Sequence, residues 1–344
     1  MIDQSQGVMA ATVREKGAAK SRSMLEALDQ QSMDIFLAQA RQASDGRFGK
    51  VLKTYIPGNK FPAISVTGLS CDLHCKHCND HYLHGMIPAE TPGKLETVLM
   101  DIHEKGGTGA LISGGSTREG IVPMEHVHGV LGKVIRSTGM QLNVHTGLIN
   151  EATARPLRET GIATISLDLV GDDGTIWKIY GLDKTVEDYK KVLHGLIHAG
   201  FTNQHIVPHV CIGLDMGKVV GEYVVLDYLR ELNPALIVFI IIIPPKQQDL
   251  HGFVNVPPAD VARVIATARV LYPDAEISLG CMRPGGSIRN EYDMAAFRAG
   301  VTRVAVPTRA LLQLARQLGY AIHRIENCCA IGAVSPPPSV PGSR

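Results

Sequence analysis

Short apolar segments alternate with longer amphipathic ones through most of the chain, and this alternation restricts the fold more than any other feature. Each apolar segment is followed by residues with helical spacing, and Gly139, Gly161 and Gly200 stand where such helices would end. Eight strands that each precede a helix predict an α/β fold, a (β/α)8 TIM-type barrel with its chemistry at the carboxyl ends of the strands. The segments that we interpret as buried β-strands are residues 61–67, 110–113, 141–145, 164–169, 205–213, 236–243, 276–280 and 303–306.

The barrel does not need the whole chain. A barrel takes about 250 residues, and the 344 residues here leave room for extensions at both ends. We predict a polar tail and a helical extension in residues 1–59, with mobile residues 1–22 and helical spacing over residues 23–42. The barrel is expected in residues 60–320, a cysteine-bearing segment in 321–332, and a disordered tail rich in proline and serine in 333–344.

Charge and hydropathy exclude some partners. The net charge is +1, which does not suggest nucleic acid or a membrane surface. No apolar run approaches the roughly 18 residues of a spanning helix, and residues 1–20 lack the apolar centre of a signal peptide. We therefore expect a cytoplasmic protein, in which clustered cysteines indicate metal binding or catalysis before disulfides.

Cys71, Cys75 and Cys78 form a C-x3-C-x2-C motif directly after the first predicted strand. A structural zinc site needs four ligands, and no second C-x-x-C pair exists, although His74, His77 or His81 could supply one. An iron–sulfur cluster also normally takes four cysteines, so three would leave one iron open. Both metals remain possible from the motif alone.

This cysteine spacing resembles the signature of the radical S-adenosylmethionine (radical SAM) superfamily. The resemblance implies a 4Fe-4S cluster whose open iron is chelated by the amino and carboxylate groups of SAM. It also implies one-electron cleavage of SAM to a 5′-deoxyadenosyl radical, which abstracts hydrogen from an unreactive C–H bond.

The resemblance also assigns residues to SAM, each with a plainer alternative. His77 would lie near the adenine, or could simply face solvent. The segment from Ser113 to Ser116 resembles the Gly-Gly-Glu element that meets the SAM amino group, with Ser116 in place of the acid; it could be only a tight turn. Asp168 would bind ribose or substrate, or be part of a structural ion pair. The residues assigned to SAM are His77, Ser113, Gly114, Gly115, His145, Asp168 and Lys184.

His145 could instead be a core histidine, and Lys184 is assigned to the SAM carboxylate by resemblance to biotin synthase. The four remaining cysteines are enough for an auxiliary cluster. Cys281 follows the seventh predicted strand and the Cys328–Cys329 pair follows the last helix, with Cys211 as an uncertain fourth ligand. Free cysteines, or a buried apolar Cys211, are the alternatives.

Residues 60–330 together resemble the biotin synthase branch of the superfamily. The segments 67–71, 77–79, 280–284 and 327–329 are most similar to the two-component lipoyl synthases. That resemblance implies sulfur insertion at an unactivated C–H carbon of an octanoyl chain on a lipoyl carrier protein, shared with a paralogous radical SAM subunit. It also implies ferredoxin or flavodoxin as electron donor.

Two alternatives of other kinds stay open. One is a radical SAM enzyme without sulfur insertion, such as a mutase of the methylornithine synthase type or a relative of the hydrogenase maturases. The other is a zinc-bound barrel that serves as a non-catalytic accessory subunit. The sequence names neither the substrate nor the sulfur-insertion step.

Overall fold

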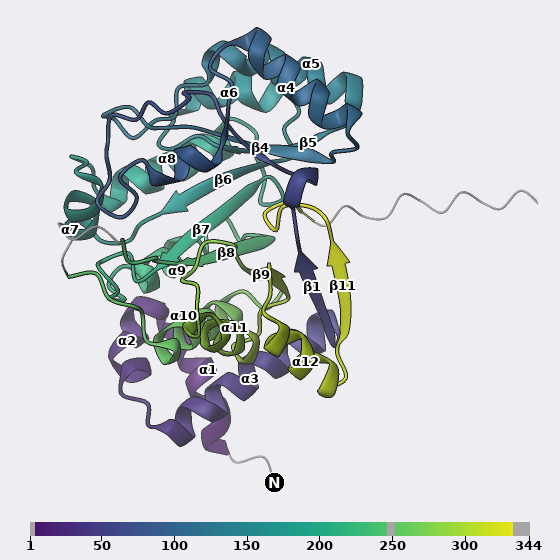
Figure 1. Ribbon diagram of the computed structural model, residues 1–344. Helices are drawn as coiled ribbons and strands as arrows, with labels where there is room; N and C mark the ends of the chain where they lie inside the picture. Colours follow the sequence, from purple (N-terminus) through teal and green to yellow (C-terminus); the bar gives the residue numbers. More distant parts are fainter. Residues whose placement is uncertain (1–3, 246–251, 333–344) are drawn as a thin grey trace, which may run out of the picture.

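The computed structural model describes residues 4–245 and 252–332, so the predicted tail at 333–344 lies outside the described residues. Within them the chain forms one curled parallel sheet covered by helices (Figure 1). The strands are β1 (Val51–Tyr55), β2 (Ala63–Ser65), β3 (Ile87–Pro88), β4 (Gly109–Ser113), β5 (Gln141–His145), β6 (Thr164–Leu169), β7 (Ile206–Ile212), β8 (Leu236–Ile241), β9 (Glu276–Leu279), β10 (Arg303–Ala305) and β11 (Ala321–Ile325).

All eight predicted strands are present, as β2 and β4 to β10, and the α/β barrel-type fold is confirmed. The predicted closure is corrected: the sheet is open, with the order β11-β1-β10-β9-β8-β7-β6-β5-β4-β2-β3 and parallel neighbours throughout the described residues. The reason is β1, which pairs with β10 at Lys53↔Arg303 and then with β11. These two additional strands occupy the edge at which β2 would otherwise close a barrel.

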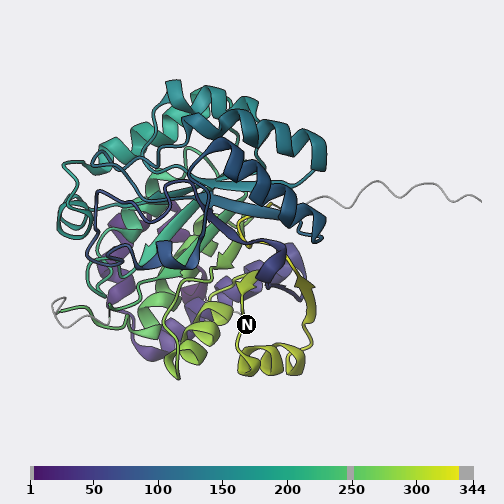
Figure 2. The ribbon, with the colours of Figure 1, turned by 45° about the horizontal axis from the view of Figure 1, so that its top comes forward.

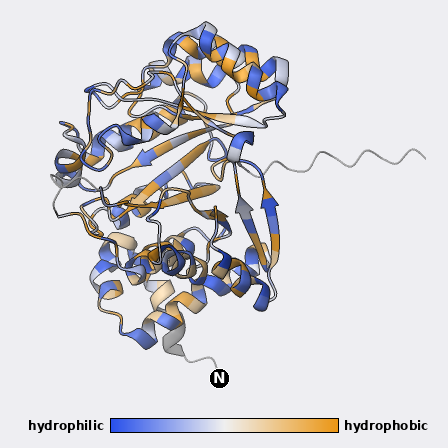
Figure 3. Ribbon diagram, viewed as in Figure 1, coloured by the Kyte–Doolittle hydropathy of each residue, from blue (hydrophilic) through white to orange (hydrophobic). Residues whose placement is uncertain are grey.

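Helices cover the outer face of the sheet, and in Figure 3 they carry alternating blue and orange stripes, as helices with one apolar face do. No helix in the described residues is long and apolar enough to cross a membrane. The helices are α1 (Gln4–Lys16), α2 (Ala18–Glu26), α3 (Gln30–Phe48), α4 (Pro92–Glu104), α5 (His128–Thr138), α6 (Glu151–Glu159), α7 (Asp173–Thr175), α8 (Val186–His198), α9 (Glu222–Tyr228), α10 (Pro258–Leu271), α11 (Ile288–Arg298) and α12 (Arg309–Gln317).

The first three helices pack on the barrel, where a mobile tail was predicted over residues 1–22. Figures 1 and 2 show them, in purple, against the green helices of the C-terminal half. Val13 and Ala18 are fully buried there. Asp227 of α9 fixes the start of α2, because its carboxylate accepts hydrogen bonds from the Ala18 and Ala19 N–H groups at 2.7 and 2.9 Å.

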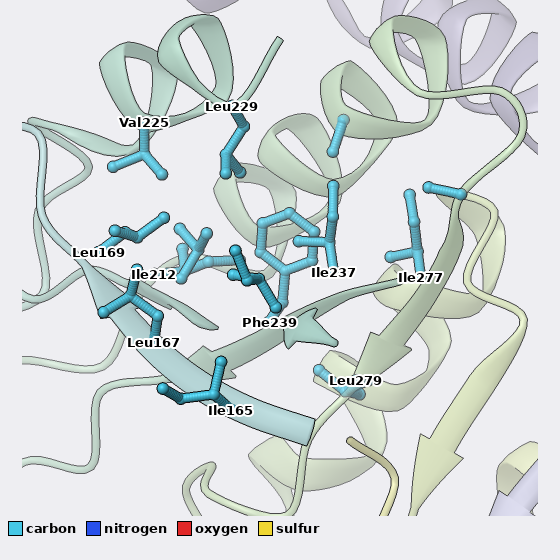
Figure 4. Close-up of a cluster of buried hydrophobic side chains, with 14 of the residues drawn as sticks. Ile165, Leu167, Leu169, Ile212, Val225, Leu229, Ile237, Phe239, Ile277 and Leu279 are labelled. Carbon is cyan, nitrogen blue, oxygen red and sulfur yellow. The ribbon is translucent and has the colours of Figure 1, made fainter. Parts of the chain in front are cut away.

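The strands separate apolar from polar side chains with a period of two. Figure 4 shows one row, Ile165, Leu167 and Leu169 of β6, in the same apolar cluster as Val225 of α9 and Leu229, which follows α9. The alternate residues of the same strands face the inside of the curled sheet, which we call the lumen. Many are polar: Lys53, Asn143, His145, Thr164, Ser166, Asp168, His209, Glu276, Ser278 and Arg303.

A buried ion pair fixes the loops after β9 and β10. Arg283 and Asp293 are both fully buried at the side chain, with Nη2 and Oδ1 2.8 Å apart. The Asp293 carboxylate also accepts a hydrogen bond from Thr308 N–H at 2.7 Å, and Arg283 donates to the carbonyls of Gly280 and Val306. The pair thus joins α11 to two loops at the carboxyl end of the sheet.

Replacing Asp293 by Ala should lower the free energy of unfolding by about 3–5 kcal/mol, because it leaves Arg283 buried and unpaired. Urea denaturation of the metal-free chain, followed by circular dichroism, measures this. Asp274→Ala is the control: its carboxylate pairs with Arg47 but is 77% exposed, and should cost no more than about 1 kcal/mol. Equal losses in both variants would contradict the role given to the buried pair.

Candidate active site

The cysteine motif lies on the loop after β2, at the carboxyl end of the sheet. Backbone hydrogen bonds tie this loop to its neighbours: Asp72 N–H donates to Ser116 O at 2.8 Å, and Lys76 N–H donates to Ile179 O at 2.9 Å. A tight turn follows, in which Cys78 N–H donates to Cys75 O at 3.0 Å. The loop is therefore held by the segments after β4 and β6.

Glycine at position 115 lets the cysteine loop approach the end of β4. An added Cβ there would collide with the Ser70 carbonyl oxygen and lie 2.6 Å from Cys71 Cβ. Thr67 Oγ1 accepts a hydrogen bond from Gly115 N–H at 2.7 Å, and Ser116 N–H donates to Cys71 Sγ at 3.4 Å. The Gly-Gly segment thus brings backbone donors to the first cysteine.

Three of the ligand atoms already converge. In the described part of the chain, Cys75, His77 and Cys78 form the group whose possible metal-ligand atoms lie within 4.8 Å of one another. The hydrogen bond between the Cys75 and Cys78 thiols raises the pKa of Cys75 and lowers the pKa of Cys78 to about 7. The charge of Cys71 raises the pKa of Cys75 further. Two thiolates this close repel each other, and a cationic metal centre would relieve that repulsion.

These cysteines open onto a cavity of about 270 Å³. Ser113, Gly114 and Gly115 line it, as does Asp168, whose side chain is 58% exposed although it points into the lumen. The cavity therefore brings together the cysteine motif and most of the residues predicted to bind SAM.

Three tyrosines, Tyr82, Tyr180 and Tyr189, also line the cavity, and the sequence reasoning gave none of them a role. The His77 and Tyr180 rings meet edge to face, with centroids 5.3 Å apart. Burial lowers the pKa of His77 to about 4, and its Nδ1 has no partner among the described residues. Tyr180 ends a π-helix, Ile176–Tyr180, which also carries the exposed Trp177. Such π-turns often mark functional sites.

Further into the lumen lies a pair of histidines. His145 Nδ1 is 4.0 Å from Asp168 Oδ2, and the His145 and His209 rings have centroids 5.2 Å apart. Burial lowers the pKa of both histidines, that of His145 to about 4, so both are neutral at pH 7. His209 Nδ1–H donates to Val207 O at 3.1 Å. His209, which was not predicted, adds a second imidazole below Asp168.

Lys184 is not brought to this cavity. It lines a different surface hollow, between Asn150 and His194. The sequence places Lys184 in the loop before α8, and this position alone does not indicate toward which cavity the loop turns.

The C-terminal cysteine pair lies inside the lumen, near the beginnings of β7 and β8. Cys329 is buried with Val207 and Leu236, and Asn143 Nδ2 faces Cys328 Sγ at 3.9 Å. Burial, followed by the charge of Cys329, raises the pKa of Cys281 to about 11. Cys328 and Cys329 therefore lie together in the lumen, whereas Cys281 follows β9 at the carboxyl end of the sheet.

Cys211 lies apart from that pair. It lies four residues after Val207 on β7, about 13 Å nearer the carboxyl end at strand spacing. Burial, and then the charges of Glu222 and Asp168, raise the pKa of its thiol. The structure thus places the predicted fourth auxiliary ligand nearer the carboxyl end of the sheet than the Cys328–Cys329 pair.

Glu222 is a buried carboxyl that anchors the end of β7. Its oxygens accept hydrogen bonds from the N–H groups of Gly213 at 2.6 Å and Val220 at 2.8 Å. Burial nevertheless raises its pKa from 4.5 to about 7, because desolvation outweighs those hydrogen bonds.

Comparison with known proteins agrees with the fold and the motif. No family model matches the chain. It is 24% identical over 249 residues to the biotin synthase of Gloeobacter violaceus, covering 69% of this chain and 74% of that protein. The crystal structure of methylornithine synthase matches with a TM-score of 0.64 at 14% identity, covering 92% of this chain and 97% of that one.

The hydrogenase maturase HydG matches with a TM-score of 0.68 at 14% identity, over 92% of this chain and 75% of that chain. The curled sheet and the cysteine loop at its carboxyl end agree with the resemblance to radical SAM proteins. Within that superfamily the sequence is similar to biotin synthases, at 24% identity to the Gloeobacter violaceus protein. Radical SAM proteins hold a 4Fe-4S cluster and SAM, and the three cysteines needed for the cluster are present here.

Gly115→Ala should reduce iron binding at the first motif by about tenfold, because the added methyl group displaces the loop that carries Cys71. Iron retained after anaerobic reconstitution and desalting gives the result. Gly129→Ala on α5 is the matched control, since an added Cβ there meets nothing within 4 Å. Unchanged iron in the Gly115 variant would contradict the close-approach argument.

Glu222 should make stability depend on pH. Its raised pKa means that folding favours the protonated carboxyl, so its contribution is complete below pH 4.5 and is lost as the pH rises through about 7. Glu222→Gln removes this dependence. As the pH rises between these limits, the unfolding free energy of the variant should increase relative to that of the wild type by roughly 3 kcal/mol. Urea denaturation from pH 4 to 8 tests this, and exposed Glu104→Gln should show no such trend.

Proposed function

We propose that this radical SAM enzyme inserts sulfur at an unactivated C–H carbon, as one subunit of a two-component lipoyl synthase acting on a protein-bound octanoyl chain. The observation that carries the proposal is the adjacent pair Cys328 and Cys329, packed inside the lumen of a sheet whose carboxyl end carries the C-x3-C-x2-C motif. The motif suits radical formation and the pair suits sulfur donation.

The first group has the residues that SAM chemistry needs. A 4Fe-4S cluster with an open iron supplies one electron to SAM and so generates a radical that removes hydrogen from an unactivated carbon. Cys71, Cys75 and Cys78 would hold that cluster. Backbone groups of Gly114 and Gly115 are free of side chains on the cavity side, and the Asp168 carboxylate can accept hydrogen bonds from ribose hydroxyls.

The residues around the second group fit an iron–sulfur cluster. With a cluster bound, Cys281, Cys328 and Cys329 would be its thiolate ligands, and Asn143 directs an amide N–H at Cys328. The Asn143 amide is itself oriented, because its Oδ1 accepts hydrogen bonds from Thr164 Oγ1 at 3.0 Å and Ser166 Oγ at 2.9 Å. A cluster there would supply a bridging sulfide that a carbon radical can take up, with one electron passing to iron.

The partners follow from the same proposal. A paralogous radical SAM subunit would share the two sulfur insertions, a lipoyl carrier protein would present the octanoyl chain, and ferredoxin or flavodoxin would supply electrons. Each of these partners is tested by adding it to the reconstituted protein.

A radical SAM mutase or maturase-type enzyme without sulfur insertion is the second candidate. It is favoured by the fold likeness to methylornithine synthase and to HydG, a maturase of the hydrogenase. Such an enzyme would need only the first cluster. Zinc on Cys75, His77 and Cys78, in an accessory subunit, is excluded if the reconstituted protein contains iron and cleaves SAM.

Anaerobically reconstituted protein should contain about eight irons per chain, and the triple variant C281A/C328A/C329A about four. Cys211→Ala is the matched control and should keep about eight, because Cys211 lies nearer the carboxyl end of the sheet than the Cys328–Cys329 pair. About four irons in both the wild type and the triple variant would favour the enzyme without sulfur insertion.

The activity is tested with SAM, reductant and an octanoylated carrier peptide, with and without the paralogous subunit. Mass spectrometry should detect both 5′-deoxyadenosine and a product that has gained sulfur. The triple variant should still form 5′-deoxyadenosine but no thiolated product. Deoxyadenosine without sulfur gain from the wild type and its partner would overturn the proposal.

A further inference from the structure

Val306, the residue directly after β10, has a backbone conformation that valine rarely adopts. Its φ is +45°, in the left-handed region, where a β-branched residue is a clear outlier. Val306 is also 45% exposed, so its own side-chain packing does not account for this conformation. Strained residues persist only where the surrounding contacts impose them, and they cluster at functional sites.

Hydrogen bonds on both sides of Val306 impose the conformation. Its N–H donates to Tyr55 O at 2.9 Å. Its carbonyl oxygen accepts hydrogen bonds from Arg283 Nη2 at 3.2 Å and from Arg289 Nη2 at 3.0 Å. Arg283 is fixed in turn by the fully buried Asp293 carboxylate. The loop after β10 is therefore held so that an apolar side chain stays exposed at the carboxyl end of the sheet.

The lumen wall beside Val306 is apolar. Cys329 and Ala330 cover its deeper part, where they pack against side chains from β1, β7, β8 and β10. Ile240, near the end of β8, contacts the same cluster but is only partly buried. The contacting side chains of the strands are Tyr55, Val207, Leu236, Val238 and Ala305.

The end of β9 joins Ile240 to Val306. Gly280 follows β9, and an added Cβ there would lie 2.9 Å from Ile240 Cγ2, so the glycine leaves room for that side chain. Arg283 Nη1 donates to Gly280 O at 2.5 Å while its Nη2 donates to Val306 O. One arginine therefore ties the ends of β9 and β10 together, with Ile240 and Val306 on either side.

The other part of the lumen is polar. Strands β5 to β7 direct His145, Asp168 and His209 inward, and a hydrocarbon chain against them would leave their polar atoms without hydrogen bonds. Ile240 and Val306 present methyl and methylene groups, against which a chain gains from burying its apolar surface. A long alkyl substrate therefore fits the side of the lumen formed by β8 to β10 better than the side that faces SAM.

We propose that Val306, together with Ile240, forms the contact surface for the aliphatic chain of the substrate at the mouth of the lumen. The inference rests on the proposed function, in which that chain is an octanoyl group, and adds the path of the chain over the ends of β8 to β10. The strain at Val306 is maintained because it holds the valine methyl groups where the chain crosses.

Substitutions at Val306 separate strain from contact. Val306→Ala removes two methyl groups and keeps the left-handed backbone, so the chain loses contact while the strain remains. Val306→Gly removes the same contact and relieves the strain, because glycine adopts positive φ readily. We therefore expect weaker use of the chain in both variants, but a higher melting temperature in Val306→Gly alone.

The experiment uses the full chain, reconstituted anaerobically, with the paralogous subunit, SAM and reductant. Thiolated product is measured by mass spectrometry over a range of octanoylated peptide concentrations. V306A and V306G should each raise the half-saturating peptide concentration about tenfold, with a smaller effect on the maximal rate. The melting temperature, followed by circular dichroism, should rise by roughly 2 °C in V306G and stay unchanged in V306A.

Asn233→Gly is the matched control. Asn233 has φ +46°, but it lies between α9 and β8, at the opposite end of the sheet. Because asparagine tolerates this conformation better than valine does, N233G should change neither the half-saturating peptide concentration nor the melting temperature. If V306A and V306G do not fold, V306T decides, since threonine keeps the shape of valine and replaces one methyl group by a hydroxyl.

An unchanged half-saturating concentration in folded V306A, or in V306T where that variant decides, overturns the inference. A melting temperature of V306G at or below that of the wild type overturns the role given to strain. The measurements are repeated with the whole octanoylated carrier protein, and the fold-change should equal that seen with the peptide. A change seen with the whole carrier alone would mean that Val306 contacts the carrier and not the chain, and would also overturn the inference.

Failure of this inference is distinguishable from failure of the proposed function. A wild-type enzyme that forms no thiolated product with its partner overturns the proposed function, and the chain path with it. A wild-type enzyme that thiolates the peptide, with Val306 variants that match it, leaves the proposed function intact and removes only the role of Val306.

Discussion

The period-two alternation along the strands is the constraint on which the rest of the molecule depends. One row of side chains, such as Ile165, Leu167 and Leu169, packs against helices and stabilises the sheet. Because stability comes from that outer layer, the inner row is free to carry polar groups. Asn143, Ser166 and Glu276 could not be tolerated inside unless they bonded one another or a ligand.

The alternation also explains why two cysteine groups can coexist. The first is on a loop at the carboxyl end of the sheet, held by backbone contacts to the segments after β4 and β6. The second is on a segment that enters the lumen near the beginnings of β7 and β8 and is held by a strand arginine. Neither group depends on the other for its position, so their chemistry can be separated by mutation.

Much of the fold could be predicted because eight strands are long enough or apolar enough to stand out, and the cysteine motif was visible as a local pattern. β1 and β11 were missed because Lys53, His323 and Arg324 interrupt their apolar character, and only pairing across the sheet makes them strands. The helix over Gln4–Lys16 has little apolar character of its own, and Val13 is buried only by tertiary contacts. His209 and Arg303 owe their places in the lumen to strand register, and Tyr180 reaches the cavity from a π-helix; the sequence reveals neither.

The π-turn at Ile176–Tyr180 has a practical consequence. It accepts a hydrogen bond from the cysteine loop through Ile179, ends in the tyrosine that meets His77, and carries the only tryptophan of the chain at Trp177. That indole is 66% exposed. The emission wavelength of Trp177 therefore depends on the polarity around the π-helix. Its fluorescence can be used to follow occupancy of the adjacent cavity.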